Sequence, residues 1–344
     1  MEKFKRLQRR EFLGGLAAIG ATALVPDVLT GAQTRPANAP VPSLIDVHYH
    51  GNSPGFIAAI KAHNTGQTAL MNWTPAKALE DMDRDGVATS IMSTSEPSVY
   101  FGDAPAARAL ARECNEYFAK LVSDRPTRFG MFATLPLPDV DGSLKEIEYA
   151  FNTLKADGVC FMSSYEGKYL GDPAFAPVMD ELNRRKAVAY THPFRGGMIN
   201  MLPDGRALGI TLSTETTVTI QSILYTNTAT RCPDIKFIWS HGGGTAPYIT
   251  SRLGAAIGPD GKPNANLAAL QKFYYDTAQA FNPYTLATFT RVVPNSHILF
   301  GTDYPFAQAA TVAKGLDADG FSAADLRAIN RDNAVALFPR LART

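Results

Sequence analysis

The 344-residue sequence predicts an α/β protein built as a single (β/α)₈, or TIM, barrel. The first observation is that short apolar runs alternate with helical patterns between residues 43 and 303. The second is that histidine and aspartate side chains follow the ends of these runs. Parallel strands that are covered on both faces read as continuous apolar runs, and repeated strand–helix units favour a closed barrel. The rival fold is an open doubly wound sheet. Its nucleotide-binding form is disfavoured because no G-x-G-x-x-G turn is present.

Each strand is predicted from an apolar run of strand length. The expected strands are Leu44–His48, Ala88–Ser93, Phe129–Leu135, Gly158–Ser163, Val188–His192, Lys236–His241, Phe273–Thr277 and Ile298–Thr302. Between them, apolar residues recur on one helical face, as in the segments 110–121, 144–154 and 175–182. Asp103, with Pro105 two residues later, predicts the start of the first of these helices.

The N-terminus has the composition of an export signal. A basic start leads to Arg9-Arg10-Glu11-Phe12-Leu13, and a short apolar stretch reaches Val25. This stretch is shorter than the ~20 residues that a membrane-spanning helix needs, and Ala37-Asn38-Ala39 offers a cleavage site. The paired arginines resemble the twin-arginine signal. We therefore expect residues 1–39 to be a twin-arginine export signal and residues 40–344 to be the barrel. The protein would then be periplasmic or otherwise exported by the twin-arginine pathway. The alternative is an amphipathic helix of the folded domain.

Composition excludes several kinds of partner. The formal net charge of +1 gives no reason to expect nucleic acid or an anionic membrane surface as a partner, and we expect no stable membrane span. The three cysteines, Cys114, Cys160 and Cys232, are odd in number and have no C-x-x-C spacing. A disulfide framework or a thiolate metal site is therefore not expected. The partner that the N-terminus does predict is the twin-arginine export machinery.

Six polar residues fall at the carboxyl ends of predicted strands, where barrel enzymes build their active sites. They are His48, His50, His192, His241, Asp276 and Asp303. Alternate residues of a strand point the same way, so His48 and His50 face one point. Three imidazoles and one carboxylate suit Zn²⁺, or another first-row divalent ion such as Mn²⁺, with room left for water or substrate. The sequence therefore predicts one divalent ion, Zn²⁺ before Mn²⁺, bound by His48, His50, His192 and Asp303.

This combination of motifs resembles the amidohydrolase superfamily. The motifs are H-x-H after the first strand, His192 after the fifth, His241-Gly242-Gly243-Gly244 after the sixth and Gly301-Thr302-Asp303-Tyr304-Pro305-Phe306 after the eighth. The closer resemblance, over about residues 43 to 340, is to the decarboxylase branch, which includes aminocarboxymuconate-semialdehyde, γ-resorcylate and 6-methylsalicylate decarboxylases. It implies a barrel of the metal-dependent hydrolase type, a homodimer, and decarboxylation of a small hydroxylated aromatic acid.

The end of the fourth strand predicts a single metal ion. Binuclear members of the superfamily need a bridging carboxylated lysine there, whereas this chain has Phe161-Met162-Ser163-Ser164. His241, a ligand of the second metal in the binuclear relatives, is then free to act as an acid or base. The alternative is that His241 binds the same ion as the other three histidines.

Two reactions fit this site. In decarboxylation, the metal chelates the carboxylate and ortho hydroxyl of a salicylate-like acid, and a proton is delivered to the ring carbon before CO₂ leaves. Asp303 and His241 are the candidate proton donors. Asp276 either orients His241 or a metal-bound water, or it caps a loop. The alternative is hydrolysis of a lactone or ester by water that the metal activates.

Substrate contacts are expected from aromatic and cationic residues near the strand ends. The candidates are Trp73, Phe194, Arg195, Arg252, Tyr304 and Phe306. The rings would hold an aromatic substrate and the guanidinium groups would attract its carboxylate. Alternatively, the rings pack in the core and the arginines are solvated.

Two other classes of function are disfavoured. Gly51-Asn52-Ser53-Pro54-Gly55 matches the G-x-S-x-G elbow of serine hydrolases, but their oxyanion hole needs the backbone N–H of the residue after the serine, which Pro54 lacks. A periplasmic binding protein would need two closing lobes and has no use for a free His241 beside a metal.

Overall fold

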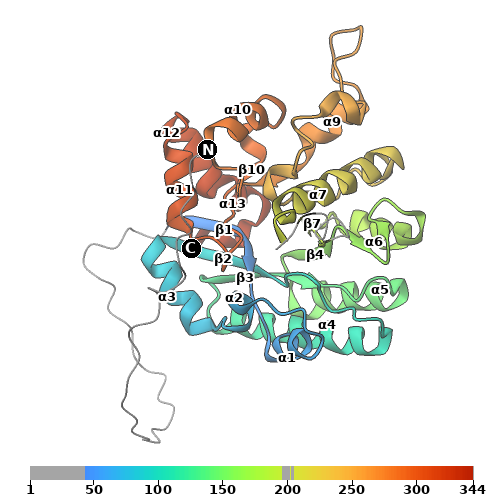
Figure 1. The fold of residues 1–344 in the computed structure, drawn as a ribbon, viewed down its shortest axis with the longest axis vertical. Coiled ribbons are helices and arrows are strands. Elements are labelled where there is room, and N and C mark those ends of the chain that lie inside the picture. Colours follow the sequence, from blue (N-terminus) through green and yellow to red (C-terminus); the bar gives the residue numbers. More distant parts are fainter. Residues whose placement is uncertain (1–42, 196–201, 203–204, 344) are drawn as a thin grey trace, which may run out of the picture. The chain divides into compact units, whose positions relative to one another are not determined.

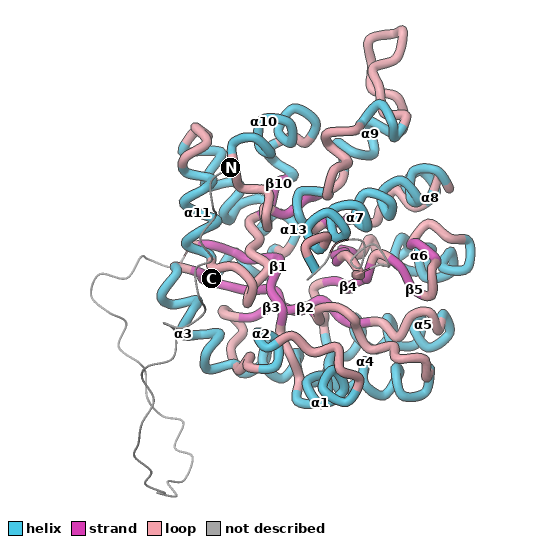
Figure 2. The backbone as a smooth tube through the Cα atoms, viewed as in Figure 1, coloured by secondary structure: helices cyan, strands magenta, loops and turns pink. Residues whose placement is uncertain are grey.

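The computed structural model describes residues 43–195, 202 and 205–343, and the expected export signal at residues 1–39 lies outside the described residues. Strands lie at the centre and helices surround them, as Figures 1 and 2 show. The strand order is β1-β2-β3-β4-β7-β8-β9-β10, and the paired strands are parallel. The barrel that the sequence predicts is therefore confirmed.

The eight barrel strands occur where apolar runs were expected. They are β1 (Leu44–His50), β2 (Val87–Ser93), β3 (Phe129–Thr134), β4 (Gly158–Met162), β7 (Val188–His192), β8 (Lys236–Trp239), β9 (Tyr274–Asp276) and β10 (Ile298–Leu299). All residues of the first five of these strands are buried. Burial on both faces explains why the runs are continuous and do not alternate with polar residues.

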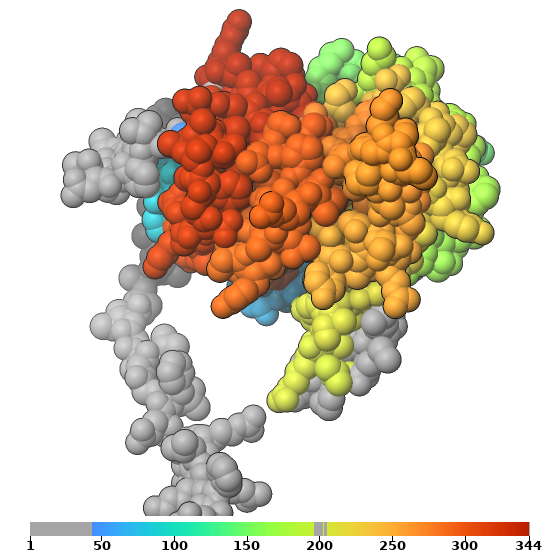
Figure 3. Space-filling model, turned by 90° about the horizontal axis from the view of Figure 1, so that it is seen from above, coloured from blue at the N-terminus to red at the C-terminus, as the bar shows by residue number. Residues whose placement is uncertain are grey.

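The helices lie between and after these strands. They are α1 (Pro54–Ala62), α2 (Thr68–Met71), α3 (Pro75–Asp85), α4 (Ala104–Asp124), α5 (Val140–Tyr149), α6 (Ala176–Arg184), α7 (Leu208–Tyr225), α8 (Thr228–Arg231), α9 (Ala265–Lys272), α10 (Pro283–Val292), α11 (Ala309–Asp317), α12 (Ala323–Arg327) and α13 (Asn333–Leu337). No helix of the described residues is long and apolar enough to cross a membrane. On the face drawn in Figure 3, the last third of the chain forms one continuous surface, coloured orange to red.

Backbone hydrogen bonds close the barrel between its first and last strands. Val47 N donates to Phe300 O at 3.0 Å, and Asp303 N donates to His48 O at 2.9 Å. Further along, His50 N donates to Tyr304 O at 2.9 Å. These bonds bring the H-x-H segment of β1 directly beside the loop that carries Asp303.

Helix starts follow the expected capping chemistry. Asp103 caps α4 by accepting a hydrogen bond from Ala106 N, as its position before Pro105 predicts. Ser53, the serine of the rejected hydrolase elbow, caps α1 by accepting from Phe56 N. Its hydroxyl also donates to Glu113. Ser53 therefore has a structural role, which agrees with the rejection of the serine-hydrolase reading.

Two features were not predicted from the sequence. The short strands β5 (Ser164–Tyr165) and β6 (Lys168–Tyr169) form an antiparallel hairpin after β4. In addition, α5 continues into a π-helical segment at Ala150–Leu154, so the apolar face expected over 144–154 spans two kinds of helix.

Candidate metal centre and active site

The four predicted metal ligands meet at the mouth of the barrel. His48 and His50 lie on β1, His192 ends β7, and Asp303 follows β10. One ligand atom from each of the four lies within 4.8 Å of the others, and all four residues are buried. Asp303 Oδ1 is 3.2 Å from His48 Nε2 and 3.0 Å from His50 Nε2. Strands that are far apart in the sequence thus place three imidazoles and one carboxylate around a single point.

Hydrogen bonds on the outer nitrogens orient two of these imidazoles. His48 Nδ1 bonds to Asp276 Oδ2 at 2.8 Å, and His192 Nδ1 donates to Pro193 O at 2.8 Å. In both rings this arrangement directs Nε2 toward the centre. His48 Nε2 is buried and makes no hydrogen bond in the described part of the chain, even though Asp303 lies close to it. The two groups aim at a common point, which is the geometry that a metal ion requires.

Burial sets the charges of the ligands. It lowers the pKa of His50, and it lowers the pKa of His192 well below the usual value, with help from the neighbouring imidazoles. Burial opposes the charge of His48 too, but Asp276 and Asp303 outweigh it and raise the pKa of His48 to about 10. Burial likewise opposes ionisation of Asp303, yet its pKa falls well below normal because of the charge of His48 and the hydrogen bonds from His241 and His50. His50 and His192 are thus favoured as neutral imidazoles beside an ionised carboxylate, which are the ligand forms that a divalent cation needs, whereas His48 has to lose its proton when an ion binds.

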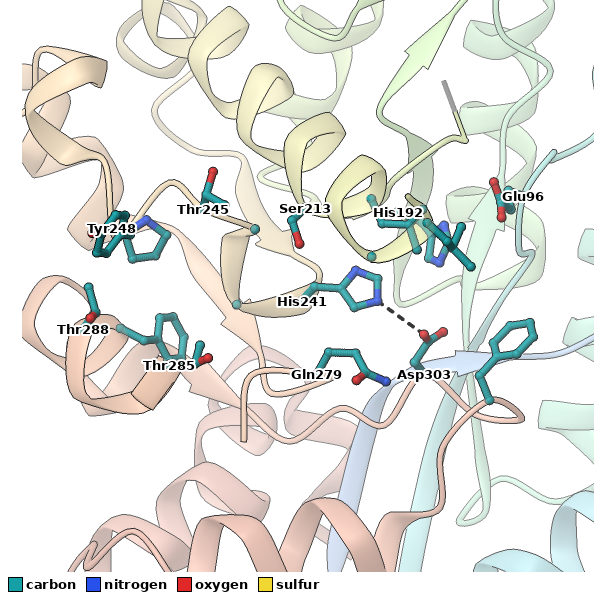
Figure 4. A pocket seen from close by; sticks show the side chains of 18 of the residues that line it. Glu96, His192, Ser213, His241, Thr245, Tyr248, Gln279, Thr285, Thr288 and Asp303 are labelled. Carbon is teal, nitrogen blue, oxygen red and sulfur yellow. Dashed lines mark hydrogen bonds and ion pairs between the residues drawn. The ribbon is translucent and has the colours of Figure 1, made fainter. Parts of the chain in front are cut away.

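His241 lies beside the four ligands but outside the group of atoms that lie within 4.8 Å of one another. Its Nε2 is 3.3 Å from Asp303 Oδ2, an interaction that Figure 4 draws as a dashed line. His241 and Asp303 both have positive backbone φ angles, 54° and 69°. Such backbone costs about 1–3 kcal/mol for a non-glycine residue and is concentrated at functional sites. The arrangement favours an acid–base role for His241 over direct membership in the ligand set.

The three glycines after His241 allow the chain to turn sharply. Gly242, Gly243 and Gly244 all have positive φ angles. A Cβ atom on Gly244 would lie 2.2 Å from the backbone oxygen of Ser213 on α7. The His-Gly-Gly-Gly motif is therefore required for the close approach of this loop to α7.

Asp276 orients His48 and not the imidazole of His241. One oxygen bonds to His48 Nδ1, and the other accepts hydrogen bonds from the backbone nitrogens of His241, at 2.9 Å, and Ala278, at 3.0 Å. The expectation that Asp276 orients the His241 ring is thus corrected: Asp276 reaches His241 only through its backbone. The loop-capping alternative holds as well, because the same carboxylate binds both backbone N–H groups.

Asp46 joins the two segments that carry the ligands. Its carboxylate accepts hydrogen bonds from His48 N at 3.0 Å, Thr302 N at 3.1 Å and the Thr302 hydroxyl at 2.6 Å. Burial raises the pKa of Asp46 to about 7. This residue and Thr302 hold β1 and the Asp303 loop in register behind the metal ligands.

A pocket with a volume of about 730 Å³ opens over the ligands. Its described lining includes His192, His241 and Asp303 at one end, together with Glu96 from the loop after β2. No lysine or arginine is among the described lining residues. No lysine or arginine of the described lining could therefore supply positive charge for the carboxylate of the expected substrate.

Two of the expected aromatic contacts are structural. Trp73 is buried in the hydrophobic core, and it is not among the described residues that line the pocket. Tyr304 stacks on Tyr49, with ring centroids 4.3 Å apart, and its hydroxyl donates to Asp81 at 2.8 Å. Both rings therefore follow the alternative in which aromatic residues pack the core.

Of the other four expected substrate contacts, one is among the described residues that line the pocket and three are not. Phe306 lines the pocket, with its ring centroid 6.1 Å from that of His50. Phe194 packs against the core, Arg252 is exposed, and neither is among the described lining residues. Arg195 is ion-paired with Glu96, which also accepts a hydrogen bond from Arg195 N at 2.8 Å. The expected carboxylate-binding role of the two arginines therefore finds no support in the described pocket, and Arg195 instead fixes a wall of it.

Three site residues were missed from the sequence. Glu96 lines the pocket, and its burial raises its pKa even though Arg195 opposes the shift. Gln279, in the loop after β9, lines it too. Glu215 on α7 is buried behind the site and accepts a hydrogen bond from Ser163, whose hydroxyl accepts one from Phe194 N. Glu96 and Gln279 do follow strands β2 and β9, so a search of every strand end would have found them.

The remaining histidines of the chain are structural. His63 stacks on Phe101 with ring centroids 4.2 Å apart, and His297 stacks on Tyr274 at 4.5 Å.

Comparison with known proteins agrees with this geometry. The family model described as amidohydrolase matches residues 45–340, so the chain belongs to the amidohydrolase family. A decarboxylase of Aspergillus niger is 36% identical over 327 residues, which cover 86% of this chain and 87% of that protein. A 6-methylsalicylic acid decarboxylase of Penicillium expansum is 35% identical over 320 residues, which cover 86% and 96%.

A solved structure shares the fold. It is a dihydroxybenzoic acid decarboxylase from Polaromonas sp. with bound manganese and the inhibitor 2-nitroresorcinol. It is 23% identical, covers 87% of this chain and 97% of its own, and superimposes with a TM-score of 0.74. Together with the relatives, the family assignment makes this chain an enzyme of the carboxy-lyase class, a decarboxylase.

Proposed function

We propose that this enzyme is a metal-dependent, non-oxidative decarboxylase of a small, salicylate-like aromatic acid. The observation that carries the proposal is the convergence of His48, His50, His192 and Asp303 on one point, with His241 beside them. The named relatives support it, because one of them acts on 6-methylsalicylic acid.

The four residues fit one divalent ion. Their donor set is three imidazoles and a carboxylate, which suits Zn²⁺ and also Mn²⁺, the ion in the Polaromonas structure. When bound, such an ion would supply Lewis-acid charge for an acid's carboxylate and ortho hydroxyl, which fits a pocket whose described lining has no arginine or lysine. Zn²⁺ stays our first expectation for the natural ion.

The chain's own groups would carry the proton. His241 and Asp303 are in contact through Nε2 and Oδ2, so a proton can pass between them and be delivered to the ring carbon that bears the carboxylate. Loss of CO₂ then restores the aromatic ring. Phe306 would lie against the ring at the pocket wall, and Glu96, which is held by its ion pair with the partly exposed Arg195, would form another part of that wall.

Hydrolysis of a lactone or ester is the alternative chemistry for the same donor set. The relatives named here are decarboxylases, so the comparisons favour the first reaction.

The experiment is metal analysis of the purified chain together with CO₂ release from a panel of ortho-hydroxybenzoates. We expect about one ion per chain and CO₂ release that a chelator abolishes and added Zn²⁺ or Mn²⁺ restores. If the chain bound one ion, released no CO₂ and hydrolysed lactones or esters, the proposed decarboxylation would be wrong and hydrolysis would be the reaction. A chain that binds no metal would overturn it.

The proton-transfer role is tested with His241→Ala. We expect the metal content to be unchanged and the rate to fall by about 10²–10⁴-fold, since general acid–base groups contribute that much. His63→Ala, at an exposed histidine that stacks on Phe101, is the matched control and should keep the full rate. Loss of metal from the His241 variant would instead identify His241 as a ligand.

A further inference from the structure

Charge is segregated along the pocket. The acidic and imidazole side chains of the described lining are Glu96, His192, His241 and Asp303. In Figure 4, Asp303, His192 and Glu96 lie on one side of His241, while Thr245, Tyr248, Thr285 and Thr288 lie on the other. We call these last four residues the distal chamber. The chamber thus presents hydroxyl groups and no charged group of its own.

The size of the pocket exceeds the needs of a single ring. Pockets of ~300–1,000 Å³ enclose drug-sized ligands, and this one measures about 730 Å³. A one-ring hydroxybenzoate bound at the metal ligands would leave the distal chamber to solvent. Tyr248 and Tyr284, which are 78% and 88% exposed, stand where the pocket meets the surface.

Hydrogen bonds fix what the chamber offers to a ligand. Thr217 donates its hydroxyl proton to Ser213 O at 2.7 Å, so in the 2.9 Å contact between Thr217 and Thr245 the donor is Thr245. Thr245 is left with oxygen lone pairs that can accept. Thr285 accepts from the side-chain nitrogen of Asn282 at 2.9 Å, and its own hydroxyl proton can be donated. An acceptor and a donor together match an alcohol, which both donates and accepts.

We infer that the distal chamber is a second substrate subsite, which takes an uncharged, hydroxyl-bearing arm extending from the aromatic ring away from its carboxylate. This inference rests on the proposed function for the placement of the carboxylate at the metal ligands. The substrate class is then an ortho-hydroxy aromatic acid with such an arm, and Thr245 and Thr285 are residues that determine specificity.

The test compares acids that differ only at the arm. Salicylate is compared with its derivatives that carry a 3-hydroxypropyl, a propyl or a 2-carboxyethyl group para to the carboxylate. We expect kcat/KM for the hydroxypropyl acid to exceed that of salicylate by at least about tenfold. The propyl acid should fall between them, and the carboxyethyl acid should be poorer than the propyl acid because the chamber has no cationic partner for it. Equal values for all four acids would overturn the inference and leave the proposed function standing.

A variant that fills the distal chamber tests whether the arm of the substrate binds there. Thr288→Phe should reduce the preference for the hydroxypropyl acid over salicylate to about one. Ala287→Phe places the same bulk on the same helix at an exposed residue outside the pocket, and it should leave the preference unchanged. If the Ala287→Phe variant also lost the preference for the hydroxypropyl acid over salicylate, the placement of the arm in the distal chamber would be contradicted. If Thr288→Phe changes the molecular mass in solution but not the preference, the chamber is filled by a second copy of the chain and the inference is wrong.

Binding of the decarboxylated products separates the two proposals. Calorimetry compares 3-(3-hydroxypropyl)phenol with phenol on the metal-loaded enzyme, without any turnover. Tighter binding of the first compound, by at least about tenfold and dependent on Thr288, would support the subsite even if none of the acids released CO₂. Equal binding would overturn it whatever the result for decarboxylation.

Discussion

At the scale of single residues, the site depends on which nitrogen of each imidazole faces inward. His48 and His192 are alike in having Nδ1 bound by an oxygen, from Asp276 in one case and from the backbone of Pro193 in the other. A histidine can bind a metal only through a nitrogen that carries no proton, so these oxygens decide the ligand geometry. Asp276 therefore supports the candidate metal site by fixing the orientation of the His48 ring.

Asp276→Asn should weaken metal binding by about 10–100-fold. The amide oxygen can still accept the backbone hydrogen bonds of His241 and Ala278, but the amide NH₂ would face His48 Nδ1 and force the proton onto Nε2. The measurement is a metal titration against a competing chelator. Glu215→Gln is the matched control, since this buried carboxylate accepts from Ser163 and Tyr169 and is not among the metal ligands. Equal affinities for the Asn and Gln variants would contradict the prediction.

At the scale of elements, the position of α7 depends on its close packing against the chain that follows β6. α7 contributes Leu212 and Ser213 to the pocket, and Glu215 behind it. The chain after β6 passes so close to this helix that a Cβ atom on Gly171 would lie 2.2 Å from Ser222 O. Gly171 N also donates to the Ser222 hydroxyl at 3.0 Å. This contact seats α7 against the barrel.

Gly171→Ala should destabilise the protein by about 1–3 kcal/mol, because the added methyl group meets backbone that cannot move aside without shifting α7. Urea denaturation measures the change in the free energy of unfolding. Gly209→Ala, on α7 itself, is the control: its Cβ meets nothing within 4 Å, and alanine favours a helix. The prediction fails if the Gly171 variant is as stable as the Gly209 variant.

Charge on α6 gives a dependence of stability on pH. Glu181 pairs with Arg184 at 2.7 Å and with Arg185 at 2.6 Å, and these partners, Arg184 first, lower the pKa of Glu181 to about 2. A carboxylate with a lowered pKa in the folded state stabilises the protein above its unfolded pKa, and this contribution is lost as the pH falls toward the folded value.

Glu181→Gln should therefore lower stability by about 0.2–1 kcal/mol at pH 7, the range for ion pairs near the surface. The difference from the parent protein should shrink as the pH falls from about 4.5 toward 2. Urea unfolding at pH 7 and at pH 3.5 measures it. A difference that is the same at both pH values would show that the ion pairs are not its cause.

At the scale of the whole molecule, the barrel unites residues that are far apart along the chain. His48 and Asp303 are separated by most of the described sequence, and backbone hydrogen bonds between β1 and the chain around β10 place them 3.2 Å apart. A barrel that must close to form its metal site is compatible with export in the folded state. Export by the twin-arginine route and a homodimer both stay predictions, the second to be measured by sedimentation.

Replacing Arg9 and Arg10 together by lysine should abolish export while leaving the barrel folded and able to bind metal. The paired arginines are the part of the expected leader that resembles the twin-arginine signal, whereas the first strand of the barrel begins at Leu44. Fractionation of cells that express the parent and the double variant measures the location. Export of the variant at the parent's level would contradict a twin-arginine signal.

The pattern of residues was enough to predict the barrel, the approximate positions of its strands and the group of candidate metal ligands that the structure brings together. Continuous apolar runs report strands that are buried on both faces, and the carboxyl ends of parallel strands meet at one mouth, so His48, His50, His192 and Asp303 could be grouped without coordinates. These inferences depend on the local pattern of apolar residues and on the barrel topology, which brings strand ends together that are far apart in the sequence.

The hydrogen-bond and packing partners of individual side chains became known from the three-dimensional structure alone. The Asp276 carboxylate bonds to the ring of His48 and not of His241, Tyr304 stacks on Tyr49, and Arg195 is held by Glu96. The sequence places all of these groups near strand ends, but side-chain rotamers and loop paths select one partner from several at similar distance. Because a hydrogen bond weakens steeply with distance and angle, differences of an ångström separate a residue of the site from a residue of the core.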